Sequence, residues 1–505
     1  MRQSAVMTFV FDNTYARLPE RFYARVAPAR VREPRLVKVN YALAELLGVD
    51  PAQLDSPEGA QIFSGNVVPE KAASIALAYA GHQFGGFVPQ LGDGRAILLG
   101  ETVGVDGKRR DIQLKGSGPT PFSRNGDGRA ALGPVLREYI VSEAMAALGI
   151  PTTRTLAAVS TGEPVYREEV LPGAVLTRVA ASHIRVGTFE YFGARRDLEA
   201  LASLTNYALA RHHARATDNG DDVAQSALKL FDRVLEAQAS LVARWLGVGF
   251  VHGVMNTDNT SISGETIDYG PCAFLDEYDP EKKFSSIDHG GRYAFANQPR
   301  IAQWNLARFA ETLLPLISER QDEAVRLATE RLERFPVVFE AHYTAVMRAK
   351  LGLLPHAELP ETDENDRALV ADLLTRMASS AVDYTVFFRE LCAAAEDPSA
   401  DARVAALFAE PQTFHAWGES WRHRMRDDSI TAAERANAMR QANPAFIPRN
   451  HRVEQAIAAA MSGDFEPFET MLRVLSRPYD DQPEFAHLAI PPRPEERVRA
   501  TFCGT

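Results

Sequence analysis

Hydrophobic and polar positions divide the chain into a β-rich part followed by a helical part. Short apolar or alternating runs, separated by glycine-rich turns, predict strands at residues 96–99, 111–115, 155–160 and 174–179. One helix interrupts these strands, because apolar residues recur every fourth position after Pro134 and Gly149 ends the pattern. The first part of the chain is therefore expected to form a sheet that carries one helix.

The rest of the chain is mainly helical from about Leu198 onward. The longest predicted helix runs from Asp222 to Leu246, and further helices follow from about residue 300 nearly to residue 474. Between them, residues 260–267 have the pattern of a small β insert. A β-rich part with one helix, followed by a helical part with a β insert, is the outline of a protein-kinase-like fold. Many α+β proteins share that outline, so the fold class has to be decided from individual residues.

The first 90 residues predict two further helices among proline-punctuated segments, at 37–47 and near 70–79. We therefore expect them to form an extension that is largely helical.

Length and composition indicate a globular protein with several domains. Its 505 residues exceed what one compact core normally accommodates, and 46% hydrophobic and 24% charged residues are ordinary values. The 55 basic and 66 acidic residues give a net charge of −11, which disfavours a nucleic-acid coat or a polybasic membrane anchor. No apolar run approaches the ~18 residues that span a bilayer, and the N-terminus does not have the pattern of a signal peptide. Three cysteines are too few for a disulfide framework and indicate a reducing compartment, so we expect a cytoplasmic protein. From the net charge and the lack of a spanning apolar run we expect no nucleic-acid or membrane partner, and we expect a monomer.

A lysine at the end of a predicted strand and a glutamate in the following helix form the first candidate pair. Lys115 ends the alternating run 111–115, and Glu138 lies early in the helix that starts at Pro134. Such a pair can be a buried ion pair that holds the ammonium group against the phosphates of a nucleotide. A surface lysine and a glutamate favoured by the helix dipole would produce the same pattern.

The segment after the longest helix predicts a metal-binding hairpin. The run His252-Gly-Val-Met-Asn-Thr-Asp-Asn is followed by a turn signal and then by Asp268-Tyr-Gly. A two-residue turn at 263–264 would pair Asn259 with Asp268, because partners in an antiparallel pair have residue numbers with a constant sum. An amide oxygen and a carboxylate placed opposite each other suit a hard divalent cation close to phosphates. A polar surface hairpin is the alternative, since Asn-Thr-Asp-Asn is common turn chemistry.

The order of these residues matches a protein kinase with one departure. Kinases carry, two residues after the histidine, an aspartate that activates the acceptor hydroxyl. Here that position is Val254, which cannot accept a proton. Asp258 is the nearest carboxylate that could act as the base instead, and His252 is expected to brace the loop.

Six motifs resemble those of the selenoprotein O family, which consists of pseudokinase-fold protein adenylyltransferases. The resemblance covers the chain from about residue 11 to its C-terminus. The motifs are Phe11-Asp-Asn-Thr-Tyr, Ala80-Gly-His-Gln-Phe-Gly-Gly, Gln90-Leu-Gly-Asp-Gly-Arg, Gln113-Leu-Lys-Gly-Ser-Gly-Pro-Thr-Pro-Phe-Ser-Arg, His252-Gly-Val-Met-Asn-Thr-Asp-Asn and Asp268-Tyr-Gly-Pro.

The resemblance implies transfer of AMP from ATP to Ser, Thr or Tyr side chains of proteins, with pyrophosphate as the leaving group. The nucleotide would bind in an inverted orientation, so that its α-phosphate faces the acceptor. The implied nucleotide contacts are Gly92, Gly94, Arg95, Lys115, Asp127, Gly128, Arg178, Arg185 and Asp268. Asn259 and Asp268 would hold Mg²⁺ or Mn²⁺, Asp258 would be the catalytic base, and Glu138 would pair with Lys115.

The resemblance also implies an α+β, kinase-like bilobal fold with helical extensions at both ends. The implied segments are an N-terminal extension (1–90), a β-rich N-lobe (91–190), a helical C-lobe with the catalytic and metal loop (191–330) and a C-terminal helical region with a redox tail (331–505). A reversible disulfide between Cys272, just after the Asp268 motif, and Cys503, third from the end, would tether the tail over the site. Two unrelated thiols are the alternative.

Three functions remain open at this stage. The first is nucleotidyl transfer to protein hydroxyls, with UMP from UTP as a close variant of AMP from ATP. The second is a γ-phosphate kinase that uses Asp258 as its base, against which Val254 counts. The third is an ATP-binding scaffold, which is disfavoured because Lys115, Glu138, Asn259 and Asp268 are all present.

Overall fold

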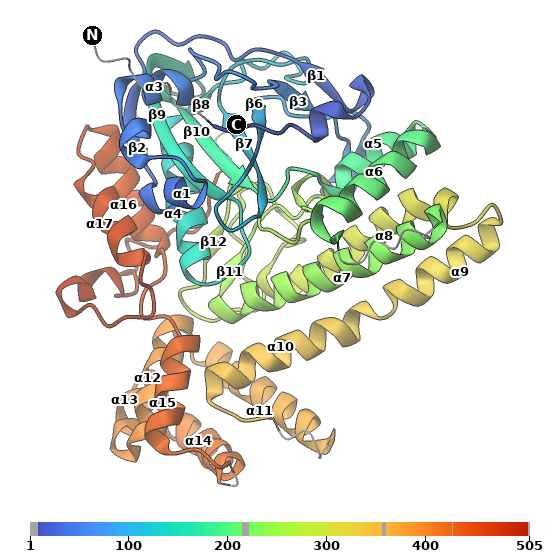
Figure 1. The fold of residues 1–505 in the computed structure, drawn as a ribbon. Helices are drawn as coiled ribbons and strands as arrows, with labels where there is room; N and C mark the ends of the chain where they lie inside the picture. The colour runs from blue at the N-terminus through green and yellow to red at the C-terminus, as the bar shows by residue number, and fades with distance from the viewer. Residues whose placement is uncertain (1–8, 215–221, 356–359, 427, 503–505) are drawn as a thin grey trace.

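The computed structural model describes residues 9–214, 222–355, 360–426 and 428–502. An antiparallel sheet forms the upper part of the molecule, and helices form the rest (Figure 1). Among the described residues the sheet has eight strands, in the order β1-β3-β6-β7-β10-β9-β2, with β8 added beside β10. In that order the strands are β1 (Tyr23–Arg25), β3 (Ile75–Leu77), β6 (Ala96–Val103), β7 (Arg109–Lys115), β10 (Val170–Ala180), β9 (Arg154–Tyr166), β2 (Arg35–Val39) and β8 (Ala130–Ala131).

The four strands predicted from the apolar runs are confirmed as β6, β7, β9 and β10, each longer than expected. The interrupting helix is confirmed as α4 (Leu132–Ala147), which begins two residues before Pro134. In the β6–β7–β10 register, Ala96 and Leu176 both lie opposite Lys115. Lys115, the last residue of β7, therefore lies at the end of the sheet where β8 leads into α4.

Of the two helices predicted in the first 90 residues, the one near 70–79 is wrong and the one at 37–47 is only partly formed. Residues 35–39 form β2, which pairs with β9, and the shorter helix α1 (Tyr41–Leu46) starts only after Asn40, whose side chain caps it. Instead of a helix near 70–79, β3 pairs with β1 and β6 and is completely buried. Pairing with neighbouring strands overrides the helical pattern at both places. With two more short helices, α2 (Pro51–Leu54) and α3 (Pro57–Phe63), this segment belongs to the main sheet and is not a helical extension.

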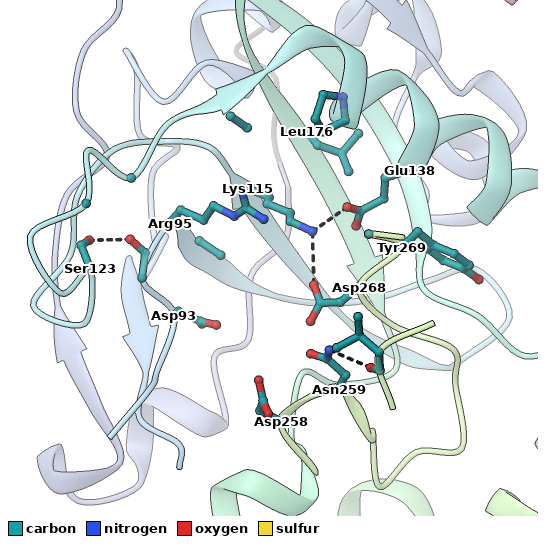
Figure 2. Close-up of a pocket in the computed structure, with 18 of the residues that line it drawn as sticks. Asp93, Arg95, Lys115, Ser123, Glu138, Leu176, Asp258, Asn259, Asp268 and Tyr269 are labelled. Atoms are coloured by element: carbon teal, nitrogen blue, oxygen red, sulfur yellow. Dashed lines mark hydrogen bonds and ion pairs between the residues drawn. The ribbon is translucent and has the colours of Figure 1, made fainter. Parts of the chain in front are cut away.

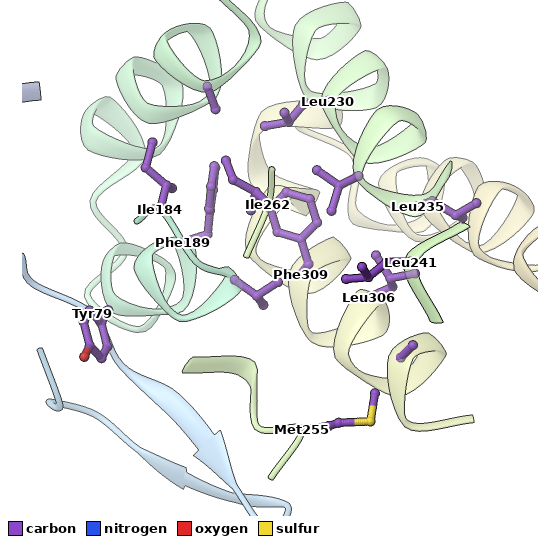
Figure 3. Packing of buried hydrophobic residues seen from close by; sticks show 14 of the residues in the cluster. Tyr79, Ile184, Phe189, Leu230, Leu235, Leu241, Met255, Ile262, Leu306 and Phe309 are labelled. Atoms are coloured by element: carbon purple, nitrogen blue, oxygen red, sulfur yellow. The ribbon is translucent and has the colours of Figure 1, made fainter. Parts of the chain in front are cut away.

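The helical part begins with α5 (Val186–Ala194), α6 (Leu198–His212) and α7 (Val223–Val248), followed by α8 (Gln298–Ile317), α9 (Gln321–Leu332) and α10 (Phe335–Leu351). The predicted long helix is confirmed as α7: Asp222 caps its start, and Gly249, with a φ of +75°, ends it. Its apolar face packs against α8, α10 and the loop between α7 and α8. Figure 3 shows Met255 and Ile262 of that loop among Leu241 of α7 and Leu306 and Phe309 of α8. The loop that carries Asp258 and Asn259 is thus anchored in the largest core.

The remaining helices fall into two groups that lie apart in Figure 1. One group contains α11 (Pro360–Ser379), α12 (Tyr384–Glu396), α13 (Asp401–Ala405), α14 (Pro411–Met425) and α15 (Ala432–Ala442). The other contains α16 (Asn450–Met461) and α17 (Glu466–Leu475), which pack on α4. Tyr139 of α4 meets Phe468 of α17 edge to face, with their ring centroids 5.6 Å apart. Within the described ranges, no helix has both the length and the apolar character needed to cross a membrane.

The C-terminal tail returns to the segment after Asp268. The Thr501 amide donates to the carbonyl oxygen of Phe284 at 2.7 Å, and its hydroxyl donates to the carbonyl oxygen of Pro271 at 2.6 Å. Cys272 is buried next to this segment. Cys503 lies outside the described residues, so the predicted Cys272–Cys503 disulfide does too.

A buried arginine joins α16 to the same segment. The Arg449 side chain is 1% exposed, and its Nη1 lies 3.0 Å from Asp276 Oδ1 and 2.7 Å from Asp383 Oδ2. Asp276 closely follows β12 (Ala273–Phe274), and Asp383 caps α12. One guanidinium group therefore fixes both helical groups to the chain that leaves the site.

Replacement Arg449→Met should destabilise the protein by about 3–5 kcal/mol, because two largely buried carboxylates would lose their cation. The measurement is urea unfolding followed by circular dichroism. The matched control is Arg403→Met, since Arg403 pairs with Glu390 at the surface with its side chain 63% exposed. That control should change stability by no more than about 0.5 kcal/mol. Equal effects of the two substitutions would contradict the anchoring role of Arg449.

Candidate functional site

A cavity of about 540 Å³ contains all the site residues predicted around Lys115 and Asp268. Figure 2 shows its centre, with Lys115 and Glu138 on one side and Asp258 and Asn259 on the other. The predicted residues that line it are Gly92, Gly94, Arg95, Lys115, Asp127, Gly128, Glu138, Arg178, Arg185, Asp258, Asn259 and Asp268. These residues come from distant parts of the chain, and the fold brings them to one place.

The predicted pair of Lys115 and Glu138 is formed. Lys115 Nζ lies 2.6 Å from Glu138 Oε2 and 3.2 Å from Asp268 Oδ1. Glu138 projects from the second turn of α4 and is nearly buried, so its carboxylate is not the surface group that the alternative interpretation required. The ammonium group is consequently held between two carboxylates at the cavity wall.

Asp268 is the centre of a cluster of three cations. Besides Lys115, it accepts hydrogen bonds from Arg178 Nη1 and Arg185 Nη1, both at 2.5 Å, and both arginine side chains are 2% exposed. Burial alone would raise the pKa of Asp268, but the guanidinium groups of Arg185 and Arg178 and the Lys115 ammonium outweigh it. They hold that pKa well below its usual range. Asp268 also has a φ of +62°, a backbone conformation that is uncommon for residues other than glycine and that recurs in turns and at functional sites.

The predicted hairpin between Asn259 and Asp268 is wrong. Ser261 pairs with Arg185, and Thr266 pairs in parallel with Thr152, so the two arms bond to other segments and not to each other. A turn is present one residue earlier than predicted, with 262–263 as its central residues, since the Gly264 amide donates to the carbonyl oxygen of Ser261. Gly264 has the positive φ that was expected, +75°. Arg185, at the start of α5, and Thr152, just before β9, are the backbone partners of the two arms. Asn259 and Asp268 nevertheless both line the cavity.

Asn259 and Asp268 fit a divalent cation by their donor chemistry. The Asn259 amide nitrogen donates to the carbonyl oxygen of Val254 at 3.0 Å, which leaves its amide oxygen available as a ligand. An amide oxygen, a carboxylate and phosphate oxygens of a substrate are the ligands that Mg²⁺ and Mn²⁺ accept. Among the described residues there is no group of three His, Cys, Asp or Glu side chains that could hold a metal alone. A cation here would therefore have to share its ligand shell with substrate and water.

Asp258 lies apart from the cation cluster and has a different environment. Burial raises its pKa to about 6, although a hydrogen bond from Gln83 Nε2 to Asp258 Oδ2, at 3.1 Å, opposes that shift. Arg185 Nη1 donates to the backbone oxygen of Asp258 at 2.6 Å. The cavity thus holds two carboxylates with opposite pKa shifts, which is the usual division between a charge-binding group and a proton acceptor.

His252 braces the loop, as expected. Its Nε2 lies 2.8 Å from the backbone oxygen of Ile267, its Nδ1 accepts from the Val254 amide at 3.4 Å, and its ring stacks on Trp245. Val254 itself is buried and lines the cavity, where a kinase would have its aspartate.

The two predicted glycine positions beside Asp93 accommodate another loop. A Cβ on Gly92 would lie 2.3 Å from Cγ of Phe122, and one on Gly94 would lie 3.0 Å from the Phe122 carbonyl oxygen. Phe122 belongs to the glycine-rich loop that also contains Asp127 and Gly128. In this structure Gly92 and Gly94 therefore make room for that loop.

Asp127 lies on the same loop and is already paired. Its carboxylate accepts two hydrogen bonds from Arg167, at 2.9 and 3.0 Å, and one from the Arg129 amide. A contact between Asp127 and a nucleotide would have to share or replace the Arg167 contacts.

Three polar side chains of the site were not singled out from the sequence. Asp93 accepts from the Leu77 amide and from Gln113 Nε2, and Gln113 Oε1 in turn accepts from Arg178. Gln83 holds Asp258. All three lie inside motifs that sequence reasoning had identified, where uncharged or glycine-flanked polar residues gave no separate signal.

Comparisons with known proteins identify the family of the chain. The model of the family described as "Protein adenylyltransferase SelO" matches residues 5–476. The chain is 60% identical to proteins named "Protein nucleotidyltransferase YdiU" from Methylorubrum populi and from Rhizobium meliloti, in both cases over 98% of this chain and 99% of the relative. A protein with the same name from Nitrobacter winogradskyi is 59% identical over 98% of this chain and 96% of its own length. The chain belongs to the SelO protein adenylyltransferase family, which makes it an enzyme with a nucleotide substrate and a protein acceptor.

Replacement Asp268→Asn should destabilise the metal-free protein by about 3–5 kcal/mol at pH 7, because three clustered cations lose their shared carboxylate. An aspartate has a pKa of about 3.9 in an unfolded chain. Since the folded-state pKa of Asp268 is lower, its stabilisation is present above about pH 4 and is lost as the pH falls through the folded-state value. Urea unfolding in EDTA should therefore show the full stability difference between wild type and Asp268→Asn at pH 7, and a difference about 1 kcal/mol smaller at pH 3. Asp127→Asn, at a carboxylate that is 45% exposed, should cost less than about 1 kcal/mol. Unchanged stability of Asp268→Asn at pH 7 would rule out the clustered arrangement.

Proposed function

We propose that this member of the SelO family transfers AMP from ATP to Ser, Thr or Tyr hydroxyls of other proteins and releases pyrophosphate. The observation that supports it best is the division of the cavity between a cluster of cations around Asp268 and a separate carboxylate, Asp258. Phosphate groups suit the cations, and an acceptor hydroxyl suits the carboxylate.

The nucleotide would bind with its phosphates against Lys115, Arg178 and Arg185. These three cations are already fixed by Asp268, Glu138 and Gln113, so little reorganisation is needed when phosphates arrive. Arg95, Gly92, Gly94 and the loop with Asp127 and Gly128 would complete the nucleotide contacts. An inverted orientation would bring the α-phosphate, and not the γ-phosphate, to the acceptor.

Transfer to the acceptor then needs one base and one leaving group. Asp258 would take the proton from the acceptor hydroxyl, and the oxygen of that hydroxyl would form a bond to the α-phosphorus. The bond from the α-phosphorus to the bridging oxygen breaks, and pyrophosphate leaves with that electron pair. Arg185 would stabilise the charge of the phosphates, since it contacts both Asp268 and the backbone of Asp258.

Asn259 and Asp268 would hold Mg²⁺ or Mn²⁺, which supplies charge neutralisation for the phosphates when it is bound. The side chains of the chain do the rest of the positioning. Lys115, Arg178 and Arg185 keep the Asp268 carboxylate deprotonated at neutral pH, because they hold its pKa well below the usual range. A metal ion would have to share the two carboxylate oxygens with these cations.

Val254 favours this proposal over a γ-phosphate kinase. It is buried at the position where a kinase has its proton acceptor, and an isopropyl group cannot accept a proton. We further propose a kinase-like bilobal arrangement in which the first 90 residues share the sheet of the N-lobe, with boundaries near residues 190 and 330, a cytoplasmic location and a monomeric state. The regulatory disulfide between Cys272 and Cys503 stays a prediction.

Isotope position distinguishes the candidate reactions. The protein is incubated with Mg²⁺ and unfolded casein as a hydroxyl-bearing acceptor, with ATP labelled at the α- or the γ-phosphorus, or with α-labelled UTP. We expect protein-bound label from α-labelled ATP and none from γ-labelled ATP. Label from the γ position alone would show a kinase, and label from UTP in preference to ATP would show UMP transfer. Binding of ATP without any label would indicate a scaffold.

Replacement Asp258→Asn should lower kcat by about 10²–10⁴-fold, because it removes the proton acceptor while keeping the size of the side chain. Affinity for ATP should stay within about twofold, since Asp258 is not part of the cation cluster. Lys115→Ala is the complementary variant and should mainly weaken ATP binding. The two are compared by α-label transfer and by equilibrium binding of ATP. A wild-type kcat in Asp258→Asn would remove Asp258 from the reaction.

A further inference from the structure

A small hairpin outside the main sheet covers the residues around Asp258. It consists of β4 (Gly81–Gln83) and β5 (Gly86–Val88), which pair only with each other in the part of the chain that the structure describes. The position of the hairpin is therefore set by its contacts with the loop at residues 256–258 and not by hydrogen bonds to the main sheet.

The hairpin is bound to that loop at three consecutive positions. Gln83 Nε2 donates to Asp258 Oδ2 at 3.1 Å, and the His82 amide donates to Thr257 Oγ1 at 2.6 Å. The Phe84 amide donates to Asn256 Oδ1 at 3.0 Å. Each of the three loop residues thus has its own partner on the hairpin.

Two further side chains secure this attachment from outside the hairpin. Glu190 of α5 contacts both His82 and Thr257 through its two carboxylate oxygens. Tyr293 donates to Asn256 Oδ1 at 2.6 Å, and its ring lies beside that of Phe84, with centroids 5.1 Å apart. The hairpin would therefore keep its place if the single contact between Gln83 and Asp258 were lost.

Asp258 itself is fitted against the backbone of the hairpin. A Cβ on Gly81 would lie 2.6 Å from Asp258 Oδ1 and 2.9 Å from Asp258 Cβ. The neighbouring Gly187 of α5 is equally confined, since its Cβ would lie 2.2 Å from the Ala80 carbonyl oxygen. The Asp258 carboxylate therefore occupies space that any side chain at position 81 would fill.

We propose that the β4–β5 hairpin is a positioning element for the proton acceptor, with Gln83 and Gly81 as its positioning residues. Gln83 fixes one carboxylate oxygen by a hydrogen bond, and Gly81 provides the space for the other. This inference rests on the proposed role of Asp258. Neither residue takes part in proton transfer, because an amide is no base at neutral pH and a glycine has no side chain.

The direct test is Gln83→Met, which keeps the length of the side chain and removes the donor. We expect kcat for label transfer from α-labelled ATP to casein to fall by about tenfold, the usual effect of losing one such hydrogen bond. The KM for ATP should stay within about twofold, and the melting temperature should fall by no more than a few degrees, because only one hydrogen bond is lost and the other hairpin contacts remain. Gln83→Glu should lower kcat further, since a second carboxylate would repel Asp258. Gln90→Met, at an exposed glutamine just beyond the hairpin, is the matched control and should behave as wild type.

Gly81→Ala tests the steric part of the proposal. The added methyl group would displace Asp258, so kcat should fall while ATP binding, measured at equilibrium, is preserved. A double variant tests whether Gln83 acts through the Asp258 carboxylate. In the Asp258→Asn background, Gln83→Met should cause no further loss, because its effect is exerted through the carboxylate.

The outcomes separate this proposal from the proposed function. If Asp258→Asn keeps the wild-type kcat, the assignment of the base is wrong, whatever the hairpin variants do. If Asp258→Asn is inactive but Gln83→Met and Gly81→Ala keep the wild-type kcat, the positioning role alone is wrong. A loss of ATP affinity in Gln83→Met, or an additive loss in the double variant, would also overturn it.

Discussion

Three cations meet around the Asp268 carboxylate, and they can lie so close together only because that carboxylate offsets their mutual repulsion. Each cation comes from a different element: Lys115 ends β7, Arg178 lies in β10 and Arg185 precedes α5. The main sheet, the start of α5 and the segment that carries Asp268 therefore meet at one ion cluster. A shift of any of these elements would leave a buried charge without its partner. The desolvation cost of that charge disfavours such a shift.

The packing of α4 holds Glu138 against Lys115 in this structure. Its outer face packs on α16 and α17 through an apolar cluster that includes Tyr139 and Phe468, and Arg137 pairs with Glu454 of α16. Rotation of α4 away from the sheet would expose that cluster as well as break the ion pair. Residues near the C-terminus thus hold the glutamate that orients a lysine more than 300 residues earlier in the chain.

Local signals made some of this structure predictable. Strands β6, β7, β9 and β10 were found because their apolar runs are short, buried and bounded by glycine, and α4 and α7 because their apolar positions recur with helical spacing. The helix expected near residues 70–79 was wrong because β3 takes its conformation from β1 and β6, which no local pattern reveals. The same reason explains the failed hairpin: Ser261 and Thr266 bond to Arg185 and Thr152, which are distant in sequence. Charged site residues in long motifs were recognisable, whereas Gln83 and Gly81 were not, because their contacts with Asp258 form only in the folded chain.

The anchored tail has a practical consequence for anyone who handles this protein. Thr501 is fixed to the chain beside Pro271, and Phe502 lines the cavity. A label or a substitution introduced at Phe502 would therefore alter the wall of the cavity directly, although this position lies more than 200 residues after Asp268 in the sequence.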